Sequence, residues 1–423
     1  MKVVLLWRGA CGVTGFAVSI IGCDIMALSS RSPVLSAEFR LLLLLSRLVL
    51  DEVQTSAACN LCKEVNDWEA VRHMAMDRFI LPVVYRHLRH LEPFSLPAEQ
   101  LALMKYQVMA LYRHDLNVIA NLAEIHEQLL LPLEIPYVTF KGPSLAVCYY
   151  DEPAMRFSRD IDILVPRERM AELLARALAA GYKPLVPHDL GNDSVSLAFV
   201  ARYQKVITLL SPRDIVIEFH SQIDNIGTVY DTRALIDRAE PTRVGSAEVS
   251  VLPTDELFVY ICWHHTKHFW SHLHWLVDLD AIQRHPSFDR QRAYSCAERH
   301  GLSSTVEVCV KMAELLGSPE FVPHDNHDER LNGLLKLSLE AMQGDLLFEH
   351  HLSSLKATPD YAFHWQTDLR HRLRWKLLGW LRRFRPSYAE YRVRPLPSGW
   401  QWLYCFLRPL LACRRRLINH NSD

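Results

Sequence analysis

The chain has 423 residues, of which 49% are hydrophobic and 22% are charged, and its formal net charge at pH 7 is −1. This length suffices for two or three domains, and the composition excludes a chain that is disordered throughout. The near-neutral balance gives no global signal for nucleic-acid binding, and the ten scattered Cys residues form no disulfide framework, which fits a reducing cytosol.

Residues 1–35 form an N-terminal segment that is assigned to no domain. Arg8 is followed by a mostly apolar stretch that ends at Cys23, and residues 20–23 resemble the cleavage box of a lipoprotein. A basic start with a short apolar run is a loose pattern, which chains without an export signal also match. We therefore expect a mis-assigned start, with Met26 as the first residue, rather than export.

Residues 36–130 are predicted to be helical, because apolar side chains recur there at the spacing of one helix face. These side chains are Phe39, Leu42, Leu43, Leu50, Ile119, Leu122, Ile125 and Leu129. The most apolar part, residues 41–50, is far shorter than the ~20 residues of a membrane-spanning helix, and Ser46 and Arg47 interrupt it. We expect no integral membrane span.

Residues 131–225 alternate between strand and helix patterns, which predicts an α+β catalytic core with a mixed sheet. Strands are predicted over residues 135–140 and 161–165, and a hairpin over residues 206–210 and 215–220. Helices are predicted over residues 143–150 and 167–180. Residues 226–357 are predicted to be helical, and residues 358–423 are a basic amphipathic tail.

Asp160 and Asp162 stand two residues apart at the start of a predicted buried strand. Residues i and i+2 of a strand share a face, so both carboxylates point the same way, about 6.5–7 Å apart along the strand. Glu218 supplies a third carboxylate from a later strand. Mg²⁺ and Mn²⁺ prefer such oxygen ligands, and two ions can clamp the two oxygens of an in-line displacement. The three carboxylates are therefore predicted metal ligands and catalytic residues.

The turn before this strand supplies candidate phosphate ligands. Lys141 and Gly142 end the first strand, and Ser144 lies in the first turn of the next helix. A glycine turn lets backbone N–H groups approach a phosphate closely. Lys141 adds a point charge, and Arg156 adds a guanidinium that can bind two oxygens. These four residues are predicted to hold a triphosphate.

Strand–Gly–x–Ser, Asp-x-Asp and a later carboxylate follow the order of parts in polymerase-β-type nucleotidyltransferases. From Glu38 to Asp280 the chain resembles the bacterial uncharacterised nucleotidyltransferase family. The matching stretches are residues 67–68, 81–85, 141–146, 156–165, 181–182 and 218–220. The resemblance implies a nucleotidyltransferase fold and Mg²⁺-dependent transfer from a nucleoside triphosphate. Gly142 and Asp160 lie farther apart than usual and Pro143 follows the glycine, which affects the triphosphate grip rather than the metal site.

His264, His268 and His272 are four residues apart, a spacing that places them on one helix face. Three interpretations stay open. The helix packs against the catalytic domain, or the histidines line the cleft for nucleotide or acceptor, or they bind zinc; we favour the first. Three nearby tryptophans are expected core residues: Trp263, Trp270 and Trp275.

The tail carries a strong positive charge, with 13 Arg or Lys residues against Glu390 and Asp423 within residues 370–423. Leu and Trp residues alternate with the basic ones, as in helices that lie on an anionic membrane surface. The alternatives are packing on the helical region and contact with a protein or nucleic acid. We expect a cytoplasmic protein, with peripheral membrane contact as one option.

Three functions compete. The first is metal-dependent transfer of a nucleoside monophosphate from a nucleoside triphosphate to an unknown acceptor. The second is a non-catalytic binding or regulatory protein on the same scaffold, since fold does not fix function. The third is a phosphotransferase for a small molecule. The presence of all three carboxylates, Asp160, Asp162 and Glu218, favours the first.

Overall fold

The computed structural model describes residues 35–408, apart from residue 94 and residues 225–228, 322–328, 345–368 and 382–383, so the segment 1–34 lies outside it. The N-terminal part is helical, as predicted. It contains α1 (Ala37–Leu45), α2 (Glu52–Glu64), α3 (Trp68–Asp77), α4 (Leu81–Leu91) and α5 (Ala98–Ile125). Side chains cap three of these helices: Ser36 accepts the N–H of Phe39, Asp51 forms a capping box with Gln54, and Asp67 accepts the N–H of Ala70.

A seven-stranded mixed sheet follows, with the strand order β3-β4-β5-β2-β1-β7-β6. Its strands are β1 (Val138–Thr139), β2 (Asp160–Leu164), β3 (Lys183–Val186), β4 (Val206–Leu210), β5 (Val216–His220), β6 (Glu240–Val244) and β7 (Ala247–Val251). The pairs β2–β5 and β1–β7 are parallel, and the other neighbours are antiparallel. The predicted α+β fold with a mixed sheet is confirmed.

The hairpin β6–β7 corrects the prediction that residues 226–357 are helical throughout. Ala247, Val249 and Val251 are buried and the residues between them are not, which is the period of two that strands show. Gly245 has a φ of +61° at the turn, a conformation that glycine adopts without strain. The strands are short and lie between helices, and β7 becomes part of the sheet only by pairing with β1.

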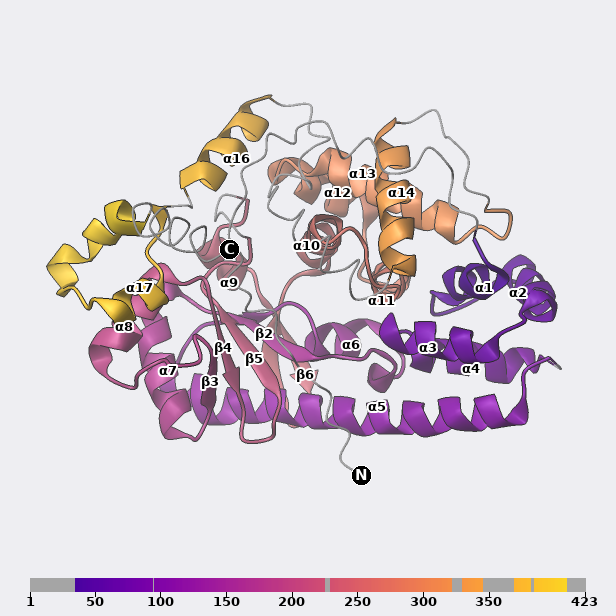
Figure 1. Cartoon of the computed structure of the whole chain (residues 1–423), viewed down its shortest axis with the longest axis horizontal. Coiled ribbons are helices and arrows are strands. Elements are labelled where there is room, and N and C mark those ends of the chain that lie inside the picture. Colours follow the sequence, from indigo (N-terminus) through magenta and orange to yellow (C-terminus); the bar gives the residue numbers. More distant parts are fainter. Residues whose placement is uncertain are drawn as a thin grey trace, which may run out of the picture.

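The two faces of the sheet differ in chemistry. Ile161, Ile217 and Phe219 belong to an apolar core that also includes side chains of α5 and of α7 (Met170–Ala179). Alternate residues of the same strands point the other way and include Asp162 and Glu218. Figure 1 shows α5 running along the lower side of the sheet. The carboxylates therefore lie on the face turned away from this core.

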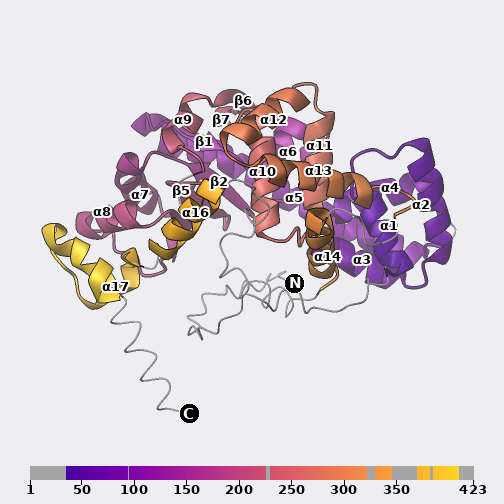
Figure 2. The ribbon, with the colours of Figure 1, turned by 90° about the horizontal axis from the view of Figure 1, so that it is seen from above.

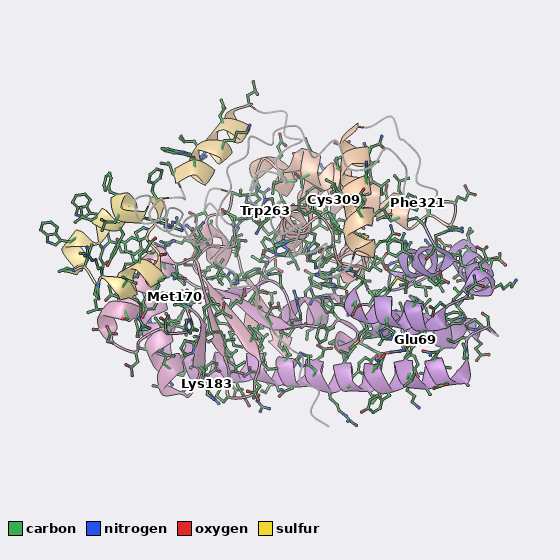
Figure 3. The ribbon with its side chains drawn as sticks, in the orientation of Figure 1. Glu69, Met170, Lys183, Trp263, Cys309 and Phe321 are labelled. Atoms are coloured by element: carbon green, nitrogen blue, oxygen red, sulfur yellow. The ribbon has the colours of Figure 1, made fainter. Side chains whose placement is uncertain are left out.

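A layer of helices lies above the sheet, on the side away from α5 (Figure 1). It comprises α10 (Thr254–Lys267), α11 (His274–Arg284), α12 (Arg290–Arg299), α13 (Ser303–Leu316) and α14 (Glu329–Gln343). This layer shares one hydrophobic core with the N-terminal helices. Trp263 of α10 and Cys309 of α13 lie inside it (Figure 3). The prediction that the three tryptophans are core residues is confirmed: Trp263, Trp270 and Trp275 are all buried.

The remaining helices connect these layers and extend the molecule at one end. They are α6 (Pro143–Tyr149), α8 (Ser194–Tyr203), α9 (Thr232–Asp237), α16 (Leu369–Leu381) and α17 (Tyr388–Val393). α17 lies beside α8 (Figures 1 and 2), where Tyr388 and Tyr391 pack against Phe199. In the described part of the chain, no helix is both long enough and apolar enough to cross a membrane. Several predicted tail residues lie outside the description, including the side chains of Arg372 and Trp375 and all of residues 409–423.

Candidate active site

Asp160, Asp162 and Glu218 come together on one face of two neighbouring parallel strands. Asp162 and Glu218 are partners in the register of β2 and β5, and Asp160 pairs with Val216 one step away. The side chain of Asp162 is 1% exposed, whereas that of Glu218 is 31% exposed. The site therefore extends from the interior to the surface, and the structure brings together the three predicted carboxylates.

His220 joins the carboxylates, although the sequence analysis did not select it as a site residue. Its Nε2 lies 2.9 Å from Asp162 Oδ1 and 3.3 Å from Glu218 Oε2. Its ring packs edge-on against Phe140, with 5.2 Å between the centroids. The available signal was its position two residues after Glu218, which puts both side chains on the same face of β5.

Lys141 brings a second cation to the same oxygen. Its Nζ lies 3.0 Å from Asp162 Oδ1, and its side chain is 19% exposed. Burial works against the charge of this lysine. The nearby anionic groups, Asp162 first, outweigh burial and raise the pKa of Lys141. The predicted phosphate ligand thus lies against a carboxylate when no nucleotide is bound.

Gly142 is required at its position by geometry. Its φ is +59°, and a Cβ built on it would lie 2.7 Å from the carbonyl oxygen of Asp160. Any other residue would therefore push against the backbone of β2. Ser144 is buried, and its hydroxyl donates to the carbonyl of Lys141 at 2.9 Å. The hydroxyl of Ser144 thus stabilises this turn.

Arg156, which was predicted to hold the triphosphate, contacts a carboxylate of the helical layer. Its guanidinium forms a two-pronged ion pair with Asp278 of α11, with Nε 2.7 Å from Oδ1 and Nη2 2.9 Å from Oδ2. Its Nη1 donates to the carbonyl of Gly142 and to the hydroxyl of Ser158. Arg156 and Asp278 are both buried. The guanidinium thus links α11 to the turn at Gly142, and its predicted role at a triphosphate stays a prediction.

The charges of the site are unevenly distributed. Burial and the neighbouring Asp162 raise the pKa of Asp160 to about 6. Burial would also raise the pKa of Asp162, but Lys141 and the hydrogen bond with His220 outweigh it and lower this pKa. Burial would lower the pKa of His220, yet its hydrogen bonds with Asp162 and Glu218 raise it. The ionised Asp162 is thus the electrostatic centre of the site.

The two carboxylate oxygens of Asp162 differ in their contacts. Oδ2 of Asp162 is buried and has no hydrogen-bond partner among the described residues. Buried carboxylate oxygens are normally satisfied, so such an atom calls for an explanation. A divalent cation bound between Asp162, Glu218 and Asp160 would supply the partner. Three side chains at this location also offer ligand atoms that lie close enough together to bind one metal ion: Asp162, Glu218 and His220.

Helix α10 lies over the carboxylate face. Tyr260 packs edge-on against Phe140 at 5.3 Å. Burial, then the positive charge of Lys141, lowers the pKa of His264, so this ring stays neutral beside the site. The sequence did not indicate that Tyr260 lies near the site. Most residues of α10 are buried, so its residue pattern does not show which side chains face the sheet.

The predicted single helix face of His264, His268 and His272 is wrong. α10 ends at Lys267, and Phe269 and Trp270 have positive φ values, so the chain turns before His272. The three histidines nevertheless gather around the ring of Trp275, at centroid distances of 5.0–6.2 Å. They belong to a packed aromatic cluster next to the site.

A family model described as uncharacterised nucleotidyltransferase matches residues 64–317, which is more than half of the chain. The chain belongs to this nucleotidyltransferase family. The match spans the whole site, from Lys141 to Asp278, and confirms the resemblance inferred from the motifs. No curated protein matches the chain. Family membership supports an enzyme that uses a nucleoside triphosphate, and the matched range ends before α14, α16 and α17 of this nucleotidyltransferase.

Proposed function

We propose that this protein is a divalent-metal-dependent nucleotidyltransferase that moves a nucleoside monophosphate from a nucleoside triphosphate to an acceptor. The observation that carries the proposal is the pairing of Asp162 with Glu218 across parallel strands, with Asp160 on the same face. The unpartnered Oδ2 of Asp162 fits a ligand of Mg²⁺ or Mn²⁺. Held by these three residues, the metal would neutralise charge at the attacking and leaving oxygens.

The other side chains bind and orient the nucleotide in this proposal. Lys141, whose Nζ lies 3.0 Å from Asp162 Oδ1, would supply a positive charge to the phosphate oxygens of a nucleotide bound at this carboxylate. Gly142 gives the phosphates close access to the backbone. Glu218, which is the more exposed carboxylate, accepts the proton of the acceptor hydroxyl. Arg156 acts as a positioning residue, since its bonds go to Asp278 and to the carbonyl of Gly142.

Product analysis tests the reaction type. The pure protein is incubated with each nucleoside triphosphate and Mg²⁺ or Mn²⁺, and the released phosphates are identified. Release of pyrophosphate identifies nucleotidyl transfer, whereas release of a nucleoside diphosphate identifies the alternative phosphotransferase. Turnover that persists unchanged in Asp162→Asn would contradict the proposed site under either reaction.

One observation favours the non-catalytic alternative. Lys141 places a cationic group against Asp162, and His220 adds a hydrogen bond to the same oxygen, so these two side chains partly neutralise and satisfy this carboxylate. A binding or regulatory protein would retain nucleotide affinity but release neither product. Calorimetric titration of a nucleoside triphosphate with Mg²⁺, combined with product analysis of the same sample, separates the two functions, because a binding protein takes up the nucleotide and releases neither product.

We also propose that the C-terminal segment contacts an anionic membrane surface from the cytoplasmic side, where nucleoside triphosphates are available. Leu369, Leu373 and Leu377 are spaced four apart along α16, and each is more than half exposed. Leu378, on the other side of the helix, packs against the core. Trp380 adds an exposed aromatic ring to the same stripe. An apolar stripe within a strongly basic segment suits the interface of an anionic bilayer.

A further inference from the structure

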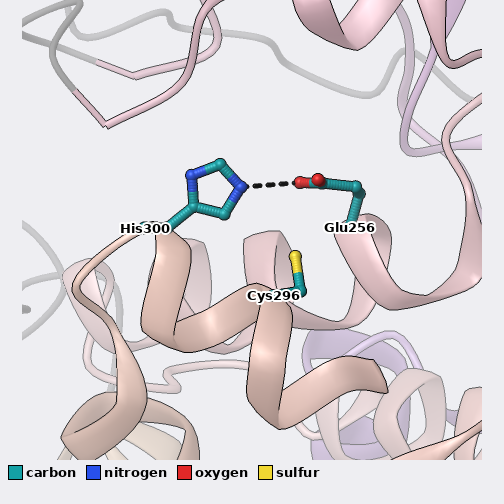
Figure 4. A group of neighbouring side chains, drawn as sticks. All are labelled: Glu256, Cys296 and His300. Carbon is teal, nitrogen blue, oxygen red and sulfur yellow. Dashed lines mark hydrogen bonds and ion pairs between the residues drawn. The ribbon is translucent and has the colours of Figure 1, made fainter.

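A second cluster of metal-ligating side chains lies in the helical layer, apart from the three carboxylates. Glu256 belongs to the first turn of α10, and Cys296 and His300 lie four residues apart at the end of α12. One ligand atom from each of the three lies within 4.8 Å of the others. In Figure 4 the ring of His300 and the thiol of Cys296 both face the carboxylate of Glu256.

We propose that Glu256, Cys296 and His300 bind a Zn²⁺ ion that fastens α10 to α12. One sulfur, one imidazole nitrogen and one carboxylate oxygen make a donor set that suits this ion. Two ligands four residues apart on a helix face the same side, so α12 can offer both at once. Tetrahedral zinc holds a nitrogen and an oxygen ligand about 3.4 Å apart at its usual bond lengths. His300 Nε2 and Glu256 Oε2 are 2.8 Å apart, so they need to separate by about 0.6 Å.

The second nitrogen of His300 is arranged as in metal-bound histidines. Nδ1 lies 3.0 Å from the backbone carbonyl of Val229, which can only accept a hydrogen bond, so Nδ1 carries a proton. Such a bond commonly fixes the ring orientation of a metal ligand and leaves Nε2 for the metal. Nε2 then faces a carboxylate oxygen, and a cation has to lie between these two acceptors. That cation is either a proton, carried by the ring or by the carboxyl group, or a metal ion.

Burial and an unsatisfied hydroxyl argue for the metal. Glu256 and Cys296 are 1% and 0% exposed. The ring of Tyr230 lies 4.4 Å from that of His300, and its buried hydroxyl has no hydrogen-bond partner among the described residues. Three protein ligands leave zinc one position for water, and that water would give the hydroxyl a partner.

The neighbouring arginines leave accessible Oε2 of Glu256, the oxygen that would bind zinc. Arg238 and Arg299 both contact Oε1 of Glu256, the oxygen that does not face His300. Oε2 remains directed at the ring of His300. Asp255 lies 3.6 Å from Arg299 and offsets part of the added positive charge. The arginines thus orient the carboxylate, as partners of a metal ligand do.

Metal content and cobalt spectroscopy test this site on the full-length protein. The protein is stripped with a chelator and titrated with Zn²⁺, and bound zinc is measured after desalting. In parallel it is titrated with Co²⁺, because a cobalt–thiolate bond gives a charge-transfer absorption that oxygen and nitrogen ligands do not give. Cys296→Ala and Glu256→Gln remove ligands. Cys309→Ala is the matched control, since Cys309 is equally buried in α13 and its Sγ donates to the carbonyl of Cys262.

We expect one tightly bound Zn²⁺ and a cobalt–thiolate band in the wild type and in Cys309→Ala. Both signals should be lost in Cys296→Ala, and Glu256→Gln should weaken zinc binding at least tenfold. Absence of the band in wild-type protein overturns the proposal and leaves His300 as a protonated partner of Glu256. Zinc bound equally by wild type and Cys296→Ala also overturns it and directs attention to Asp162, Glu218 and His220. If Cys296→Ala does not fold, the cobalt band of the wild type and its loss in Glu256→Gln decide the question.

Discussion

Asp162 and Glu218 lie opposite each other on the parallel strands β2 and β5, and Nε2 of His220 contacts both carboxylates. Two carboxylates this close repel each other unless a cation lies between them. In the absence of metal, His220 and Lys141 serve that purpose for Asp162. The proposed metal therefore enters a site whose ligands are already aligned by strand register.

Replacing a carboxylate by its amide should separate chemistry from folding. Asp162→Asn keeps the shape of the side chain but removes the charge that holds a divalent cation, so metal-dependent turnover should fall by at least 100-fold. Glu218→Gln should lower kcat more than it weakens nucleotide binding, since this residue is proposed to accept a proton. Steady-state kinetics and Mg²⁺ titration measure both effects. Glu248→Gln on β7 is an exposed control, and turnover in Asp162→Asn equal to that of the control excludes the site.

Gly142→Ala should be more damaging than the same change at Gly245. Both glycines have a φ close to +60°, but a Cβ at Gly142 meets the carbonyl oxygen of Asp160 at 2.7 Å, whereas nothing lies within 4 Å at Gly245. Gly245→Ala should cost about 1 kcal/mol, the expense of a left-handed conformation. Gly142→Ala adds the displacement of β2 and should also reduce turnover. Urea unfolding and activity assays check this, and equal losses at both positions would contradict the close approach.

The ion pair of Arg156 with Asp278 should matter for stability more than for nucleotide affinity. Asp278→Leu leaves a buried guanidinium without its partner and should cost about 3–5 kcal/mol of the free energy of unfolding. Arg156→Met combined with Asp278→Leu should recover much of that loss. Denaturant unfolding measures the cycle.

Nucleotide titration of the double variant then distinguishes the two roles of Arg156. A positioning residue predicts a folded double variant with nearly unchanged affinity for nucleoside triphosphate and a lower kcat. A folded double variant that has lost nucleotide affinity would instead show that the guanidinium grips the triphosphate.

The buried carboxyl of Asp115 should make the protein less stable as the pH rises. Burial raises its pKa to about 8 from an ordinary 3.8, although the N–H of Ser158 and the charge of Arg156 oppose the shift. The folded state therefore keeps a proton that the unfolded state loses, and stability falls between about pH 4 and pH 8. Asp115→Asn cannot ionise, so its stability relative to wild type should increase by up to about 1.4 kcal/mol per pH unit in that window. Urea unfolding at several pH values measures this, with the exposed Asp237→Asn as control; parallel curves for wild type and Asp115→Asn would refute it.

The exposed stripe of α16 should bind anionic vesicles. Leu373→Glu combined with Trp380→Glu places charge in the apolar stripe and should abolish co-sedimentation with such vesicles at low salt. Leu116→Glu is the matched control, because Leu116 is an exposed leucine of α5. Binding that is absent in the wild type, or that survives the double substitution, would leave a protein partner or solvent as the neighbour of this stripe.

The sequence alone determined the helical N-terminal region, most of the strands and the shared face of Asp160 and Asp162, because these depend on local periodicity and on spacing within one strand. Asp160 and Asp162 had to share a face, whatever the strand paired with. The hairpin β6–β7 was missed since its short strands lie between helices and join the sheet only through the pairing of β7 with β1. The helix face assigned to His264, His268 and His272 failed because spacing cannot show where a helix ends when tertiary packing ends it.

Only the tertiary structure decided which carboxylates lie opposite each other and which acidic group each basic side chain contacts. The register of β2 against β5 put Asp162 opposite Glu218, and no feature of either strand by itself specifies that register. Arg156 pairs with Asp278 of α11, 122 residues later in the chain, because a buried guanidinium is destabilising unless it contacts a buried carboxylate. Glu256, Cys296 and His300 met for the same reason: packing α10 against α12 brings together side chains whose separation in sequence carries no information about contact.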